Sequence, residues 1–183
     1  MIEILLDRGA KPNQKPMLEP NGLFELKDTV LGLAAKWCAD SIVSVLLKAG
    51  ADPNMAMWAT PLQEASWAGC PESVGLLIRK GAYVDQKTDG ESALDGLGRR
   101  SHEAGYRLRY YRDHVEVAKQ LIAAGANPTA REAELRLALR NPQSRFLGRR
   151  WAKEILGLLQ QAMKVQPQSG SVRSTEKSSD RMN

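Results

Sequence analysis

The residues of this 183-residue chain that could perform chemistry are few and far apart. Its two histidines, His102 and His114, have no second ligand beside them at the spacing that a metal site requires. The sequence also lacks a nucleophile elbow, a metalloprotease helix motif, a phosphate-binding glycine loop and a dinucleotide fingerprint. We therefore expect a protein that is not an enzyme and that holds neither a metal nor a cofactor.

Two carboxylates come close together in the stretch TDGES, residues 88–92, which could suggest a paired-carboxylate site. Asp89 and Glu91 flank Gly90, however, and an Asp-Gly pair is typical of tight turns. We expect a hairpin tip at this point. Ser92 then caps the start of a helix and is not a nucleophile.

The two cysteines, Cys38 and Cys70, are too few for a disulfide scaffold and belong to no Cys/His cluster. We expect both to be small buried hydrophobic residues in a reducing compartment. No apolar run approaches the roughly 18 residues that a membrane helix needs, and the first residues resemble neither a signal peptide nor an Arg-rich leader. The expected location is cytoplasmic, without membrane binding, and the expected state is a monomer.

Four apolar segments with similar endings indicate an internal repeat. In each segment apolar residues fall three and four apart, as on one face of a helix. A Gly-Ala pair follows each segment, and its glycine suits the left-handed residue that ends a helix. The four segments and endings are IEILL with GAKPN at 9–13, IVSVLL with GADPN at 50–54, VGLLI with GAYVD at 81–85, and VEVAKQLI with GANPT at 125–129.

A shorter helical signal precedes three of these segments. It begins with a Thr or Ser that can cap a helix, and Pro61 suits a first helical turn. The three signals are TVLGLAA at 29–35, TPLQEAS at 60–66 and SALDGL at 92–97. From capping residue to closing glycine the first two units span 21 residues each and the third spans 33, so about 12 residues are inserted in the third.

With two helices and a turn in each unit, the sequence resembles the ankyrin repeat family, whose repeat of about 33 residues carries a TPLHxA signature. Residues 60–65 match this signature, except that Gln63 replaces the His. Gly32 and Asp95 replace the same His in the other units, so its bond to the capping hydroxyl must be lost or remade. The resemblance covers residues 1 to about 129. It implies an all-α repeat solenoid, a stack of helix pairs with hairpin turns.

The resemblance also divides the chain. It implies a half repeat at 1–14 and repeats near 23–54, 55–85 and 86–129, the last with a loop insertion at 99–112. Two helical patterns within 130–164 lack the Gly-Ala ending and are expected to close the stack. The Ser-rich tail, 165–183, is expected to be disordered. Because the chain begins inside a second helix without a polar outer surface, we expect a fragment or an array that has lost upstream repeats.

In the ankyrin family, turn tips and the exposed side of the first helices line a concave surface that binds partner proteins. Trp and Arg dominate interface energetics, so Trp37, Trp67 and Arg99 are the first candidates for anchors. In the alternative interpretation, Trp37 and Trp67 pack on each other or under the 15–28 loop, and Trp58 folds onto its own loop. The predicted partner-binding residues are Lys36, Trp37, Met57, Trp58, Trp67, Asp89, Glu91, Arg99, Arg100, Arg107, Tyr110 and Arg112.

Charge is segregated along the chain. Residues 1–98 carry 9 positive and 13 negative side chains, whereas residues 99–183 carry 17 positive and 8 negative. We expect an acidic segment of a protein partner to be drawn to the basic half while an apolar anchor meets the tryptophans. Three alternatives remain: nucleic-acid binding through the Arg/Tyr-rich insertion, a merely solvated loop, and a fragment of a larger ankyrin-repeat protein with no independent activity.

Overall fold

The structure is a computed structural model that describes residues 2–14, 28–97, 111–129, 131–132 and 149–165. In these residues the chain forms seven helices and no strand beyond one β-bridge between Thr88 and Glu91. The helices are α1 (Ile2–Asp7), α2 (Val30–Lys36), α3 (Asp40–Lys48), α4 (Pro61–Ala68), α5 (Pro71–Arg79), α6 (Tyr111–Ala123) and α8 (Arg149–Val165). The predicted all-α repeat solenoid is confirmed.

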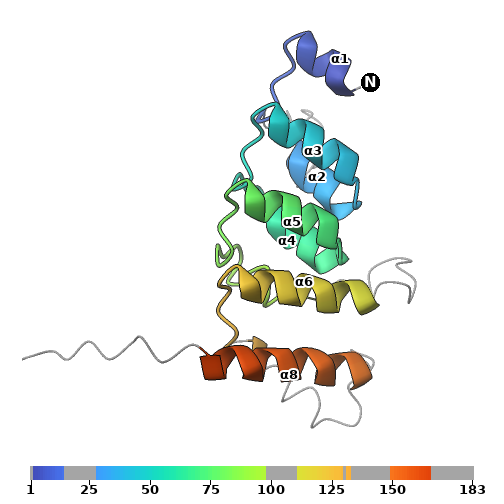
Figure 1. Ribbon diagram of the computed structural model, residues 1–183. Helices are drawn as coiled ribbons and strands as arrows, with labels where there is room; N and C mark the ends of the chain where they lie inside the picture. The colour runs from blue at the N-terminus through green and yellow to red at the C-terminus, as the bar shows by residue number, and fades with distance from the viewer. Residues whose placement is uncertain (1, 15–27, 98–110, 130, 133–148, 166–183) are drawn as a thin grey trace, which may run out of the picture.

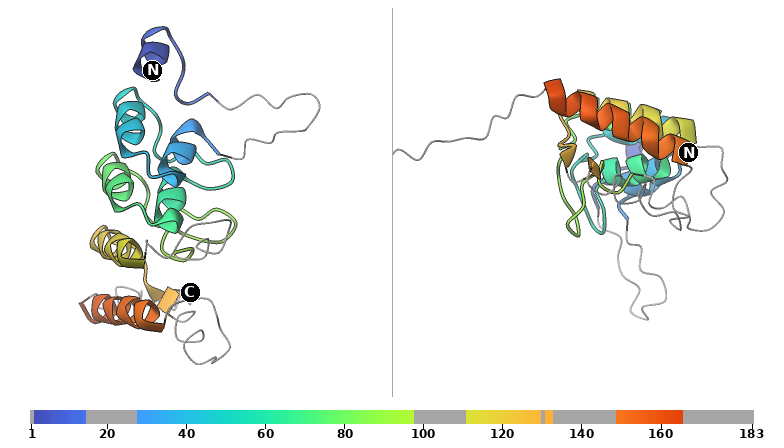
Figure 2. Two further views of the ribbon diagram at one scale, coloured as in Figure 1. Left: turned by 90° about the vertical axis from the view of Figure 1, so that its right-hand side faces the viewer. Right: turned by 90° about the horizontal axis from the view of Figure 1, so that it is seen from below.

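The helix pairs are stacked in chain order along one axis, from α1 at one end to α8 at the other (Figure 1). Helices α3, α5, α6 and α8 form one column, α2 and α4 lie beside it, and the hairpins project from the far side of α2 and α4 (Figure 2). Helix α2 packs on α4, α5 packs on both α3 and α6, and α6 packs on α8. Stability therefore comes from contacts between neighbours in the stack.

One hydrophobic cluster runs through the stack from α2 to α8. The second helix of each unit contributes residues from a single face, such as Val43 and Leu47 of α3 or Val74 and Leu77 of α5. Their spacing of three or four residues is the one that the sequence pattern predicts for an amphipathic helix.

The glycine of each Gly-Ala pair ends a helix, as predicted. Gly9, Gly50, Gly81 and Gly125 have φ of 92°, 84°, 86° and 93°, in the left-handed region that residues with a Cβ seldom adopt. The amide of the following alanine then bonds back into the last turn: Ala51 N donates to Leu46 O at 2.9 Å. This geometry satisfies carbonyls that the end of a helix leaves without partners.

Side chains at the hairpin tips join each unit to the next. Asn54 Nδ2 donates to Gly81 O at 3.0 Å, and Asn54 Oδ1 accepts from Tyr83 N at 2.7 Å. Asn13 makes the same two bonds to Gly50 and Asp52 of the following unit. The link from Asp85 has one bond instead of two. Its carboxylate accepts from Asn127 N at 3.0 Å but has no N–H to donate to a backbone carbonyl.

The residues in place of the signature His remake the lost cap in two of three units. The side chains of Gln63 and Asp95 accept a bond from the backbone N–H of the capping residues Thr60 and Ser92, respectively. The backbone N–H of Gln63 or Asp95 donates in return to the hydroxyl of the same capping residue. Such reciprocal bonds form a capping box. Gly32 has no side chain to do so, and only its N–H bonds Thr29 Oγ1, at 2.9 Å.

Two details differ from expectation. Residues 93–97 form turns instead of an α-helix within the described part of the third unit. The two cysteines, which were expected to be separate buried hydrophobic residues, are also different from the prediction. Cys38 and Cys70 form a disulfide, with Cα atoms 5.3 Å apart. The reason is the stacking itself, because 32 residues separate the two positions, which is about one repeat.

Several predicted segments lie wholly or mostly outside the described residues: the first closing helix apart from residues 131–132, the 15–28 loop apart from Asp28, most of the 99–112 insertion and the predicted disordered tail. The second closing helix is α8. It buries Ala152, Ile155 and Leu159 against the stack, so the predicted helix over 145–163 is present from Arg149 onward.

Candidate functional site

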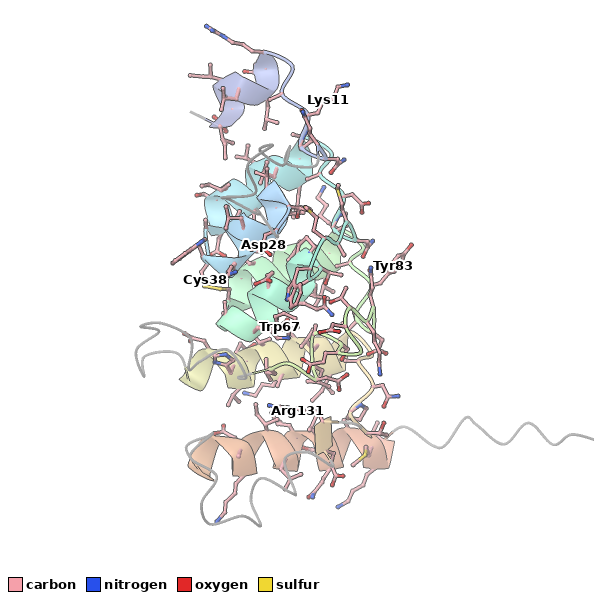
Figure 3. All side chains as sticks on the ribbon, turned by 180° about the vertical axis from the view of Figure 1, so that it is seen from behind. Lys11, Asp28, Cys38, Trp67, Tyr83 and Arg131 are labelled. Carbon is pink, nitrogen blue, oxygen red and sulfur yellow. A yellow bond between two sulfur atoms is a disulfide. The ribbon has the colours of Figure 1, made fainter. Side chains whose placement is uncertain are left out.

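Exposed aromatic and sulfur-containing side chains gather on the hairpins. Trp58 is 50% exposed, Met57 is 37% exposed, and Tyr83 on the next hairpin is 68% exposed. The backbone that carries them is well anchored, because Thr60 begins α4 in a capping box and Tyr83 N bonds to Asn54. Tyr83 and Lys11 project on the hairpin side of the stack, and Cys38 lies on the opposite side (Figure 3). Three large side chains are therefore presented from fixed turns.

A second exposed aromatic lies at the other end of the first-helix layer. Trp37 follows the last residue of α2 and is 64% exposed. The backbone N–H of Trp37 donates to Leu33 O at 3.2 Å, which holds the backbone of this residue at the end of the helix. First helices run from the hairpin side toward the Cys38 side, and the eight residues of α4 span about 12 Å. A ligand that contacts both Trp37 and Trp58 must extend across this layer.

Lys36 is engaged within the protein. Its Nζ lies 3.1 Å from Asp28 Oδ2 and 3.9 Å from Glu64 Oε2. Glu64 is buried in α4, so a nearby ammonium compensates for the loss of water around its carboxylate. Lys36 is placed at the edge of the predicted surface, with its charge shared between two internal carboxylates.

The prediction that Trp67 presents its indole to a partner is wrong in its premise, because Trp67 is only 6% exposed. Its side chain packs against Gly96, where an added Cβ would overlap the indole ring. Its carbonyl also accepts a hydrogen bond from Nε2 of the buried His114, at 3.2 Å. Trp67 is a structural contact between the second and third units. Trp37, by contrast, is 64% exposed.

The TDGES stretch is a hairpin tip, as predicted. Asp89 and Gly90 have φ of 53° and 80°, and Thr88 and Glu91 exchange backbone bonds of 3.1 Å across the turn. Gln63 reaches this hairpin and donates to Glu91 O at 2.6 Å. Asp89 is exposed and Glu91 is partly buried, so the two carboxylates of the tip lie in different surroundings.

The structure brings together only part of the predicted set. Arg112 lies in the first turn of α6. Arg99, Arg100, Arg107 and Tyr110 lie outside the described residues. Tyr83 was missed, although its position carried a signal: the residue after the Gly-Ala pair is Lys11, Asp52 and Asn127 in the other units, and a large aromatic replaces these polar residues here.

No group of histidine, cysteine and carboxylate side chains suited to a metal occurs in the part of the chain that the structure describes. The helices in that part are all too short or too polar to cross a membrane.

Comparison with known proteins identifies the repeat. Residues 57–89 match the family model of the ankyrin repeat, a range that includes α4 and α5 and ends at Asp89. A protein of Rickettsia felis (strain ATCC VR-1525 / URRWXCal2), named as an ankyrin repeat protein, is 32% identical over 111 residues. The match covers 57% of this chain and 46% of the relative, so the chain spans about half the length of the curated relative that it matches. Ankyrin repeats generally mediate protein–protein interaction and are generally non-catalytic.

Proposed function

Because the chain carries the ankyrin repeat, we propose that it is a non-catalytic module that binds a protein partner on the face formed by its first helices and turn tips. The observation that carries this proposal is the exposure of Trp37 and Trp58 on well-anchored backbone. Exposed tryptophans are costly in water unless a ligand covers them, and tryptophan is among the residues most enriched at interface anchors.

The two groups of exposed side chains define the footprint of this partner. Trp37 supplies an anchor at one end of the first-helix layer, and Met57, Trp58 and Tyr83 supply an apolar patch on the hairpins. Asp89 adds an exposed carboxylate on the hairpin that follows Tyr83 in the chain. A standard interface buries roughly 800 Å² on each partner, which is enough to cover both groups.

Charge favours a partner with an acidic segment. The excess of positive side chains lies in residues 99–183, and Lys153 and Lys164 of α8 are exposed at that end of the stack. An acidic segment would be steered to this end while apolar side chains contact Trp37 and Trp58. The proposal includes the division of the chain into a half repeat, three repeats and closing helices.

A second candidate function rests on the insertion. Residues 99–113 contain five arginines and three tyrosines, a composition that can contact a nucleic-acid backbone and stack on bases. On this proposal the affinity for RNA or DNA falls steeply with salt and depends on Arg99, Arg100, Arg107 and Arg112.

The experiment is a comparison of matched variants. The parent, Trp37→Ala/Trp58→Ala and Ile42→Ala are used to capture proteins from nuclease-treated lysate at low and at physiological salt. Ile42 is the control because it is an exposed apolar residue on α3, outside the first-helix layer. Proteins held by the parent are identified by mass spectrometry, purified and titrated against each variant.

We expect the tryptophan variant to bind at least about 30-fold more weakly, since truncation of one true anchor costs about 2 kcal/mol or more. Ile42→Ala should bind like the parent. Equal binding by all three proteins would refute the proposed face. A different result would favour the insertion as the functional site: nucleic acid is recovered from untreated lysate, and no protein is retained from nuclease-treated lysate.

A further inference from the structure

The disulfide joins equivalent loops of consecutive units. Cys38 lies in the loop between α2 and α3, and Cys70 is the residue before α5, in the loop that follows α4. Their Cα atoms are 5.3 Å apart, which is within the range that a disulfide spans without backbone movement. The bond lies at the side of the stack opposite the hairpins (Figure 3).

The backbone at Cys38 has a conformation that favours glycine. Its φ is 51°, and the residue at the same distance from the helix cap in the next unit is Gly69, with φ of 76°. Residues with a Cβ are uncommon in this region of φ. From this position the sulfur of Cys38 reaches Cys70 of the next unit. The disulfide therefore explains why a cysteine occupies a position whose backbone conformation favours glycine.

The two cysteine residues differ in exposure to solvent. Cys70 is 2% exposed and belongs to the hydrophobic core, whereas Cys38 lies at the edge of that core and is only partly buried. A thiolate must be reached by its reaction partner, so exposure decides which cysteine reacts first.

We propose that Cys38 and Cys70 form a reversible redox crosslink between the first and second complete units, in which Cys38 reacts with a low-molecular-weight disulfide and Cys70 resolves the product. Glutathione disulfide represents this class of oxidant. Cys38 is then a site of S-thiolation in the reduced protein, and the crosslink is the product that remains.

The chemistry balances as two thiol–disulfide exchanges. The Cys38 thiolate attacks one sulfur of glutathione disulfide, and the sulfur–sulfur bond breaks with its electron pair leaving on the first glutathione thiolate. Cys70 loses its proton to solvent and attacks the Cys38 sulfur of the mixed disulfide, which expels the second glutathione thiolate. Two cysteine thiols are oxidised by two electrons and one glutathione disulfide is reduced. Excess reduced glutathione reverses both steps.

The consequence concerns the stack. The crosslink ties two units that also pack through α2 on α4 and α3 on α5 and are joined by the bonds of Asn54 at the hairpin tips. In an array stabilised by neighbours, a covalent link between two units opposes separation at that interface. The stability of this part of the solenoid thus depends on the thiol redox state around it.

The test uses the full chain, reduced and then exposed to glutathione disulfide under native conditions, with intact mass as the readout. The wild type should lose two hydrogen atoms and retain no glutathione. Cys70→Ser should gain one glutathione, and Cys38→Ser should react at least about tenfold more slowly because its remaining thiol is buried. Peptide mapping of the wild type after short exposure should locate transient glutathione on Cys38, which makes the test independent of how the variants fold.

The unfolding of the same proteins in urea checks the consequence. The oxidised wild type should unfold at a higher urea concentration than the reduced wild type, and Cys38→Ser/Cys70→Ser should show no dependence on redox state. The proposal is overturned if the wild type keeps two alkylatable thiols after oxidation, or if transient glutathione is found on Cys70 instead of Cys38. An equal rate for both single variants would also contradict the assigned roles.

Discussion

At the scale of single residues, the contact between Trp67 and Gly96 shows how two units are held in register. The indole of Trp67 occupies the space that a side chain at Gly96 would need, and His114 bonds the Trp67 carbonyl from α6. A residue that could have been an exposed anchor is therefore buried between units. Trp37 and Trp58, by contrast, are exposed.

We expect Gly96→Ala to lower the free energy of unfolding by about 1–3 kcal/mol, because the added methyl group must displace the Trp67 ring in a close-packed core. Gly157→Ala is the matched control. No atom would obstruct a Cβ at Gly157, which lies within α8, so alanine there should stabilise the protein by up to about 1 kcal/mol. Urea denaturation followed by circular dichroism measures both changes. A neutral Gly96→Ala would show that the indole moves at little cost.

At the scale of elements, the hairpin tips act as connectors as well as turns. The first three tips each carry an Asn or Asp whose side chain bonds the backbone of the next tip. These hydrogen bonds connect consecutive units outside the hydrophobic core. They also fix the turns that present Trp58 and Tyr83 to a partner.

We expect Asn54→Ala to lower the free energy of unfolding by about 1–2 kcal/mol, because it removes the bonds to Gly81 O and Tyr83 N. Asn54→Asp retains the acceptor and loses the donor, as Asp85 does in the next unit, and should cost less. Equilibrium unfolding in urea measures the two variants side by side. Equal losses would contradict the role assigned to the acceptor bond.

At the scale of the whole molecule, the contacts among the described residues pass from each unit to its neighbour, as far as α8. Helix α8 packs on α6, and its Ile155 and Leu159 are both fully buried. In such an array an element is stabilised by its neighbours, so the loss of this contact should be felt locally.

We expect Leu159→Ala to lower the free energy of unfolding by about 2–4 kcal/mol through the cavity that it leaves. Amide hydrogen exchange, measured by mass spectrometry, should increase in α6 and α8 and change little in α3, because the array is coupled between neighbours. Leu158→Ala on the same helix is the control, since Leu158 is only partly buried. A uniform increase in exchange over all helices would contradict this local coupling.

The sequence was sufficient for most of the local elements, with the exception of the helix predicted at 92–97. Gly50 and Gly81 mark helix ends because only a left-handed residue closes these turns, and the apolar spacing before them identifies the buried face of each helix. The Asp-Gly turn and the capping residues follow from equally local chemistry. These patterns act over a few residues, so they can be read along the chain.

The tertiary structure alone decided which side chains meet across units. Trp37 and Trp67 looked alike as candidate anchors, yet one is exposed and the other is buried, because Gly96 and His114 come from the following unit. The pairing of Cys38 with Cys70 likewise depends on stacking, although their spacing of about one repeat was a usable signal. Exposure and pairing are set by packing between units, and residue type and local spacing do not specify that packing.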